Sequence, residues 1–442
     1  MKIVHSRKSR SAAIAAATAL VLVPLAACGG GDGSGDADGV VEIQFWDTQA
    51  TPARTESLNE IIDLFEAQNP DIRVSYVGLP SDSYEQKVDT AIATGSTPDV
   101  ITASITDSAN WVAQGALAPL DDRFEEGGWP DLISASMVET ARSVVPDHQL
   151  YFAPDTGLAN TMWLNLGILE AEGVAVPTTW DEFYDAAEQL THPERNQFGY
   201  IFRGGAGMFP QVLDAMYGQS GVSSFFDDDG NSTLNDPRNV AALERYVGLF
   251  GNQTASADLT NEYTNMVAQF ASGSGVLMNH NIGSYQDHVE ALGAENVLGL
   301  QPFPSAGGPV TVSGATVLGQ AMFAESEHPD EAWRFIEFFL APEGNAIWAE
   351  QSGKIPSNLE VAEQDWIVEA QPLQAAIAAL NDPATQVLRE PFYLPEYNAI
   401  AKTQLEPMWQ AVLQGDMTVQ EFLDTAAAAY TEAEASYRER VS

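Results

Sequence analysis

From residue 40 onward the chain alternates between β-rich runs and amphipathic helical runs. Residues 40–46, VVEIQFW, have the composition and alternation of a strand. Residues 52–68 carry apolar side chains at helical spacing, at Leu58, Ile61, Ile62 and Phe65. The next segments keep this order, with a strand at 69–79, a helix at 83–95 and a strand at 97–104. This alternation predicts an α/β fold in which helices cover the faces of the sheets.

Later helices begin at recognisable caps. Residues 179–182, TWDE, and 418–421, TVQE, are capping boxes, in which each end of the motif satisfies a free backbone N–H of the other. Asp236 stands directly before Pro237, so we expect a helix that starts there. The preceding acidic run, 227–236, faintly resembles a calcium loop. Its twelfth position is Arg238 where such a loop needs a glutamate, so a turn is the better interpretation.

Acidic residues greatly outnumber basic ones in this chain. There are 62 Asp and Glu against 19 Lys and Arg, and the formal net charge is −43. Nucleic-acid binding is excluded on this balance, because phosphate contacts need Lys and Arg. A solvated surface is one explanation of the acidity, and a cationic ligand is the sharper alternative. The length of 442 residues suits two domains of ordinary size.

The only cysteine, Cys28, follows a typical export signal. Residues 1–10 carry four basic residues and no acid, and residues 11–27 are apolar and small. Residues 25–28, LAAC, resemble the lipobox of bacterial lipoproteins, which implies a signal peptide at 1–27 and a diacylated Cys28. Residues 28–39 are rich in Gly, Ser and Asp, so we expect a flexible tether there.

Five segments in order carry a family resemblance. They are FEAQNPDIRVSYVGL (65–79), YEQKVDTAIATGSTPDVI (84–101), AQGALAPLDD (113–122), the run 151–191 that begins YFAPDTGLANTMW, and the run 328–358 that ends SGKIPSN. Together they resemble the extracellular solute-binding proteins, family 1, of ABC importers, a family that includes the maltose-binding protein. The resemblance covers nearly all of residues 40–442.

The resemblance implies a two-lobe, type II periplasmic-binding-protein-like fold with a ligand cleft between lobes joined by a multi-crossing hinge. The N-lobe would take residues 40–152 and 306–359, and the C-lobe residues 157–303 and 362–442. Crossings are expected near 153–156, 303–305 and 358–359.

The resemblance also implies a function. We expect a receptor and not an enzyme, anchored by lipid at the extracellular face of the plasma membrane. It would capture a sugar or oligosaccharide as a monomer without a cofactor, and deliver it to the permease subunits of an ABC importer.

Candidate ligand contacts follow from the loops that face the cleft in this family. On the N-lobe they are Trp46, Asp47, Thr48, Asp82, Tyr84, Ser104, Thr106 and Asp107. On the crossings and the C-lobe they are Asp155, Arg203, Phe209, Tyr285, Gly314 and Tyr397. Aromatic rings suit the C–H faces of a sugar, and planar polar groups suit its edges. For Trp46 a place in the core, and for Asp47 a capping role, are equally good interpretations.

No catalytic or metal-binding motif is present. A Gly-x-Ser-x-Gly elbow and a His-Glu-x-x-His helix are both missing, and the six histidines are scattered. The many carboxylates leave a secreted glycoside hydrolase or lyase open as an alternative. A receptor for a polyol, a glycerophosphodiester or a polyamine is a closer alternative.

The role of Cys28 can be tested directly. We expect Cys28→Ser to prevent acylation and to release the protein into the medium, because the lipid tether is lost. Ligand affinity of the released protein should equal that of the wild type. Fractionation into membrane and medium, followed by calorimetry, measures both. Loss of ligand binding in the variant would instead place the thiol in the binding site.

Overall fold

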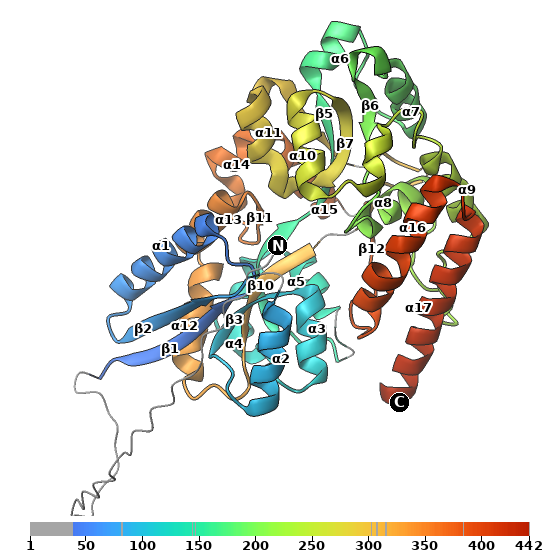
Figure 1. Ribbon diagram of the computed structural model, residues 1–442. Coiled ribbons are helices and arrows are strands. Elements are labelled where there is room, and N and C mark those ends of the chain that lie inside the picture. The colour runs from blue at the N-terminus through green and yellow to red at the C-terminus, as the bar shows by residue number, and fades with distance from the viewer. Residues whose placement is uncertain are drawn as a thin grey trace, which may run out of the picture. The chain divides into compact units, whose positions relative to one another are not determined.

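The computed structural model describes residues 39–441 apart from residues 81, 82, 144, 146, 302, 306, 307, 314, 315 and 383. Cys28, the expected signal peptide, nearly all of the tether, Asp82 and Gly314 lie outside the described residues. The described part is a mixed α/β fold built on two main sheets (Figure 1). None of its helices combines the length and the apolar character needed to cross a membrane.

The larger sheet has the strand order β11-β4-β10-β3-β1-β2. Its strands are β1 (Val41–Asp47), β2 (Ile72–Gly78), β3 (Val100–Ser104), β4 (Phe152–Leu158), β10 (Thr316–Met322) and β11 (Ile355–Pro356). β1 pairs in parallel with β2 and β3, whereas β10 runs antiparallel to β3 and β4. Its helices are α1 (Pro52–Gln68), α2 (Tyr84–Thr94), α3 (Ile105–Ala113), α4 (Asp121–Glu126), α5 (Ala135–Arg142), α12 (Pro329–Leu340) and α13 (Pro342–Ser352). We call this group of elements the N-lobe.

The second sheet has the order β6-β7-β5-β8. Its strands are β5 (Asn160–Asn165), β6 (Phe198–Ile201), β7 (Gly275–Asn281) and β8 (Val297–Leu300). The helices grouped with it are α6 (Leu166–Glu172), α7 (Trp180–Gln189), α8 (Phe209–Ser220), α9 (Pro237–Val247), α10 (Tyr263–Ser272), α11 (Tyr285–Leu292), α14 (Asp365–Glu369), α15 (Gln371–Asn381), α16 (Glu406–Gln414) and α17 (Val419–Val441). A small sheet pairs β9 (Thr311–Ser313) with β12 (Gln386–Leu388), and a π-helix spans Ala399–Leu405. We call this group the C-lobe.

Sheet membership locates the first passage between the lobes. β4 pairs with β10 up to Leu158, and β5 opens the other sheet at Asn160. The chain therefore passes between the sheets at residues 158–160, a few residues beyond the crossing expected near 153–156. The return passages lie between β8 and β10 and between β11 and α15. The expected lobe limits themselves stay a prediction.

The hydrophobic stripe expected at 52–68 is present in α1. Leu58, Ile61, Ile62 and Phe65 are all buried, and Thr51 caps the helix by accepting a hydrogen bond from the Arg54 N–H. Phe65 packs edge-on against Phe335 of α12 at 5.0 Å between ring centroids, so α1 and α12 share one core. Burial of this stripe, more than helix propensity, holds the helix in place.

The expected caps also form. Thr418 and Glu421 make the reciprocal bonds of a capping box. The Thr179 hydroxyl accepts from the Glu182 N–H as expected, but the Glu182 carboxylate accepts from the Thr178 N–H, one residue before the predicted partner. Asp236 caps α9 by accepting from the Arg238 N–H. In the preceding acidic run, Asp227 accepts backbone N–H bonds from Asp229 and Asn231, which confirms the turn.

Asn345 of α13 joins segments that are far apart in the sequence. Its side-chain amide is fully buried and donates to the carbonyl oxygens of Asp155 (2.7 Å) and Phe339 (2.9 Å). Its oxygen accepts from the Asn358 N–H at 3.3 Å. One side chain thus connects α13 to β4, to the end of α12 and to the segment after β11.

Removing the Asn345 amide should destabilise the fold. We expect Asn345→Ala to cost roughly 2–4 kcal/mol, because it leaves buried carbonyl and N–H groups without partners. The matched control is Gln351→Ala on the same helix, whose exposed amide donates to Glu60 and should change stability by less than about 0.5 kcal/mol. Urea unfolding measures both. Equal midpoints for the two variants would contradict the role given to Asn345.

Candidate functional site

Two adjoining cavities lie between the lobes. The first has a volume of about 310 Å³ and is lined from the N-lobe by Thr106, Leu158 and Thr316. Its C-lobe lining includes Asn160, Arg203, Phe209, Gln211, Asn281, Glu390, Phe392, Tyr397, Lys402 and Glu406. The second, of about 270 Å³, shares Thr106, Phe392, Tyr397 and Asn398 with the first. We call the two together the interlobe cleft.

Aromatic rings form one wall of the cleft. Phe209 opens α8, and Phe392 and Tyr397 come from the segment between β12 and the π-helix. Phe392 lies 4.8 Å from Tyr397 between ring centroids, and Phe209 lies 6.4 Å from Tyr397. Phe392 is half-buried, whereas Phe209 and Tyr397 are buried, so Phe392 offers the most accessible flat apolar face to a ligand.

Amide side chains at strand ends form another wall. Asn160 begins β5 and Asn281 ends β7, and the two are register partners across the sheet. The Asn160 amide donates to the buried Asp214 carboxylate at 2.6 Å, and Asn279 donates to the same oxygen at 3.1 Å. Planar groups are therefore held in fixed orientations beside the aromatic wall.

Glu390 places a buried carboxyl group in the cleft. Its side chain is among the cavity lining although the residue is only 8% exposed. The Tyr397 hydroxyl donates a hydrogen bond to it. Burial raises the pKa of Glu390 to about 7, and the charge of Asp214 adds to this effect.

The π-helix supplies two further charged residues. It carries Lys402 and leads directly into α16, which begins with Glu406. Glu406 accepts the Gly207 N–H at 2.7 Å. Short π-helical segments are frequent at functional sites because they redirect side chains out of the regular helical register.

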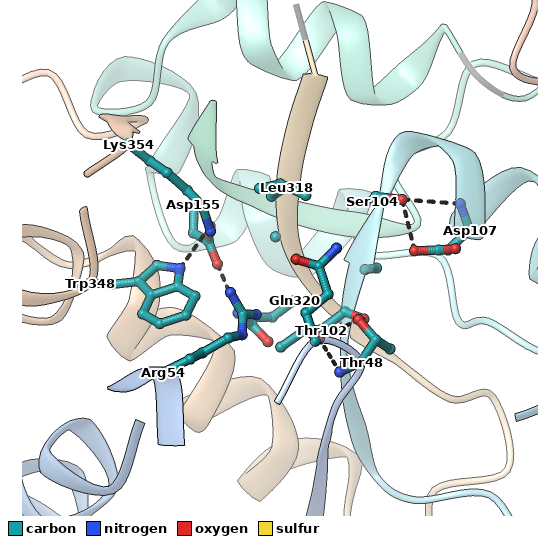
Figure 2. A pocket seen from close by; sticks show the side chains of 13 residues that line it. Thr48, Arg54, Thr102, Ser104, Asp107, Asp155, Leu318, Gln320, Trp348 and Lys354 are labelled. Atoms are coloured by element: carbon teal, nitrogen blue, oxygen red, sulfur yellow. Dashed lines mark hydrogen bonds between the residues drawn. The ribbon is translucent and has the colours of Figure 1, made fainter. Parts of the chain in front are cut away.

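A cluster of charges lies at the end of β1, in a small pocket of the N-lobe that shares Asp107 with the interlobe cleft (Figure 2). Arg54 and Lys354 both lie over the Trp348 ring, at 4.5 and 4.9 Å from its centroid. The Trp348 indole N–H donates to Asp155 at 3.3 Å, and the Gln320 amide donates to Asp155 at 2.8 Å. Burial lowers the pKa of Lys354 to about 7 and raises the pKa of Asp155.

Four residues predicted on the N-lobe come together at the start of α3. The Tyr84 hydroxyl and the Ser104 hydroxyl donate to the two oxygens of Asp107, at 2.8 and 2.7 Å. Thr106 lines both cavities of the interlobe cleft, and Asp107 lines the second. Ser104 and Asp107 also line the small pocket of Figure 2. Burial raises the pKa of Asp107, although the hydroxyl donors oppose this effect.

Trp46, Asp47 and Thr48 have other partners. Trp46 belongs to the core and lines neither cavity of the interlobe cleft, so this structure does not offer its ring as a stacking face there. Asp47 is buried and pairs with Arg54 at 2.8 Å. Thr48 exchanges hydrogen bonds with Thr102 and lines the small pocket of Figure 2. For Trp46, the interpretation as a core residue is the one that the structure favours.

The other predicted contacts lie in different parts of the structure. Arg203, Phe209 and Tyr397 line the interlobe cleft. Tyr285 instead stacks on Trp163 at 6.0 Å between ring centroids and packs against the core behind the sheet. Asp155 lies in β4, 1% exposed, and its oxygens are engaged by Gln320, Thr156 and Trp348. Asp82 and Gly314 lie outside the described residues.

Sequence reasoning missed Asn160, Glu390 and Phe392. Glu390 stands in LREPFYL (388–394), where one acid is enclosed by apolar and aromatic residues. That pattern indicates a buried carboxylate, so the sequence does carry a signal for Glu390. Among the described residues, no group of three or more His, Cys, Asp or Glu side chains is placed to hold a metal ion.

The buried Glu390 should make stability depend on pH. The folded protein holds this proton more tightly than the unfolded chain, so its contribution to stability is complete below pH 4.5 and is lost as pH rises towards about 7. We expect Glu390→Gln to match the wild type near pH 4.5 and to be more stable by up to about 3 kcal/mol at pH 8. Denaturant melts across this range measure the difference. The exposed Glu369→Gln is the control, and an equal pH response of both variants would contradict the assignment.

Comparison with known proteins agrees with this architecture. The family model for bacterial extracellular solute-binding proteins matches residues 51–346, more than half of the chain. The mannitol-binding protein of Pseudomonas aeruginosa is 24% identical over 391 residues, which cover 84% of this chain and 88% of that protein.

Two solved structures show the same fold. The sugar-binding protein MalE of Xanthomonas citri has a TM-score of 0.75 at 17% identity and covers 91% of this chain and 99% of its own. A solute-binding protein of Thermotoga lettingae, solved with α-D-tagatose, has a TM-score of 0.74 at 20% identity and covers 89% of this chain and 100% of its own. With the two-sheet fold and the family match together, the chain belongs to the bacterial extracellular solute-binding protein family.

Proposed function

We propose that this protein is a lipid-anchored receptor that captures a sugar or oligosaccharide outside the cell and delivers it to an ABC importer. One observation carries the proposal: the interlobe cleft combines three aromatic rings with amide and carboxyl groups on a lining that both lobes supply. The lipid anchor rests on the lipobox-like residues 25–28 alone.

The chemistry of a sugar matches this lining. A pyranose has C–H-rich faces and a rim of hydroxyl groups. Phe392, in contact with the more buried ring of Tyr397, offers a surface to the faces. Asn160, Asn281 and Glu390 offer planar donors and acceptors to the rim. The volume of about 310 Å³ falls in the range of small-molecule sites.

The position of the cleft suits capture by closure. Thr106 and Thr316 of the N-lobe line the same cavity as the C-lobe rings. A ligand that touches both lobes binds best when they are close together, so binding shifts the population towards the closed state. A permease can then distinguish loaded receptors from empty ones by shape.

The names of similar proteins agree with a carbohydrate or polyol ligand. They include the mannitol-binding protein and receptors solved with α-D-tagatose and with acarbose. A receptor function, rather than a catalytic one, is shared by the family. We infer a monomeric receptor at the outer face of the plasma membrane that uses no cofactor and no metal.

A panel experiment tests the proposal. Purified protein is incubated with mono- and oligosaccharides and with polyols, thermal shift detects binding, and chromatography of the same mixtures detects products. We expect saturable binding without turnover, with a stabilisation of about 2.7 kcal/mol at 100 times the dissociation constant. Product formation would make the protein an enzyme, and an unchanged melting temperature with every sugar and polyol would reject a carbohydrate receptor.

The aromatic wall provides a mutational test with a matched control. We expect Phe392→Ala to weaken binding of the best panel sugar by roughly 1–3 kcal/mol, because a stacking face is lost. Phe226 is a half-buried phenylalanine of the same lobe that packs on the core next to Phe225, so Phe226→Ala should leave affinity unchanged. Calorimetry measures both. Wild-type affinity in Phe392→Ala would place the ligand elsewhere.

A further inference from the structure

Glu390 is a buried acid without a cationic partner. Among the described residues it makes no ion pair, and its hydrogen-bond donor is the Tyr397 hydroxyl. The adjacent base, Arg389, pairs instead with Glu139 of α5 at 3.3 Å. The side chain nevertheless lines the cavity of about 310 Å³. A carboxylate that is more than nine-tenths buried in this way bears a large desolvation cost in the empty protein.

A second carboxyl group makes this end of the cleft more negative. Asp214 of α8 is 1% exposed and accepts hydrogen bonds from Asn160 and Asn279. Its charge acts on Glu390 and opposes ionisation there. Asn160 lines the cavity, so Asp214 lies directly behind the lining.

The cations of the cavity are engaged elsewhere or are solvated. The Arg203 Nε donates to the Ala206 carbonyl at 2.8 Å, and the charges that act on Arg203 are those of Glu406, Glu262 and Tyr263. Lys402 is exposed on the π-helix. Among the described residues, neither Arg203 nor Lys402 forms an ion pair with Glu390, although both line the same cavity. This carboxyl group therefore has no ion-pair partner.

We propose that the ligand carries a protonated amine, as an amino sugar does, and that Glu390 receives this amine in the cleft. The inference rests on the proposed function and narrows its ligand class. An ammonium group would supply the missing counter-charge and up to three N–H donors to the carboxylate. A neutral hydroxyl would donate one hydrogen bond and leave the charge uncompensated.

Two other features favour a cation at this position. Phe209, Phe392 and Tyr397 surround the same cavity, and aromatic faces attract ammonium groups that lie over them. The chain also carries a formal net charge of −43, which concentrates cationic solutes near the protein and repels anionic ones. A neutral sugar gains from neither effect.

Pairs of sugars that carry either an amine or a hydroxyl group at C2 test the proposal. The pairs are glucosamine with glucose, galactosamine with galactose, and β-1,4-linked glucosamine oligomers with cello-oligosaccharides of the same length, so each pair differs only in the amine or hydroxyl at C2. Calorimetry at pH 7.5 measures both members with the wild type. We expect the amine member of the best-bound pair to bind at least about tenfold more tightly.

Two variants assign the preference to Glu390. Glu390→Gln should remove most of the amine preference, because the amide has no charge that could compensate an ammonium group. Glu369→Gln is the control: this exposed acid of α14 lines neither cavity of the interlobe cleft, so the preference should persist. Circular dichroism confirms that each variant is folded.

The outcomes separate this inference from the proposed function. If neutral sugars bind as tightly as their amine partners, or if Glu390→Gln keeps the preference, the amine proposal is overturned and the sugar receptor stands. If the protein binds neither member of any pair and no other panel sugar, both proposals fail.

Discussion

Burial of Asp155 is the constraint on which the N-lobe and the first lobe passage depend. Its carboxylate is held by Gln320 of β10, Thr156 of β4 and Trp348 of α13. Its backbone carbonyl accepts from Asn345 and from the Ser357 N–H. A buried carboxyl group must find such donors or destabilise the fold, so this one residue ties together four segments far apart in the sequence. β4 then ends at Leu158, directly at the cleft.

Glu390 is also a buried carboxyl group, but it has fewer hydrogen-bond donors than Asp155. Asp155 is enclosed by donors and lies near Lys354 and Arg54, whose charges favour its ionised form. Glu390 has one hydroxyl donor, and the charge of Asp214 opposes its ionisation. The Asp155 carboxyl group therefore holds elements of the fold together. The Glu390 carboxyl group is instead left without a compensating charge at the wall of a cavity. A buried acid whose partners all belong to the protein is typical of a structural site. A buried acid that lines a cavity and has no cationic partner is typical of a binding site.

Periodicity predicted the local structure well because it reports local physics. The stripe Leu58, Ile61, Ile62 and Phe65 is buried in α1, and the caps at Thr179, Asp236 and Thr418 form as expected. The site was harder to predict. Arg203, Phe209 and Tyr397 reach the cleft, whereas Trp46 packs into the core and Tyr285 stacks on Trp163. Whether an aromatic ring at a strand end faces a ligand or a neighbouring helix depends on packing partners that lie far away in the sequence.

The α/β class, the helix starts, the acidity and the family resemblance could all be predicted before the fold was known, because they depend on neighbouring residues, composition and ordered motifs. That Asn160, Glu390 and Phe392 share a cavity with Thr106 and Thr316 became evident from the assembled fold alone. These residues come from four separate segments, and their proximity follows from how the two sheets and the segment after β12 are placed. Burial and charge compensation are likewise properties of the assembled fold, so the role of Glu390 could not be derived before its surroundings were known.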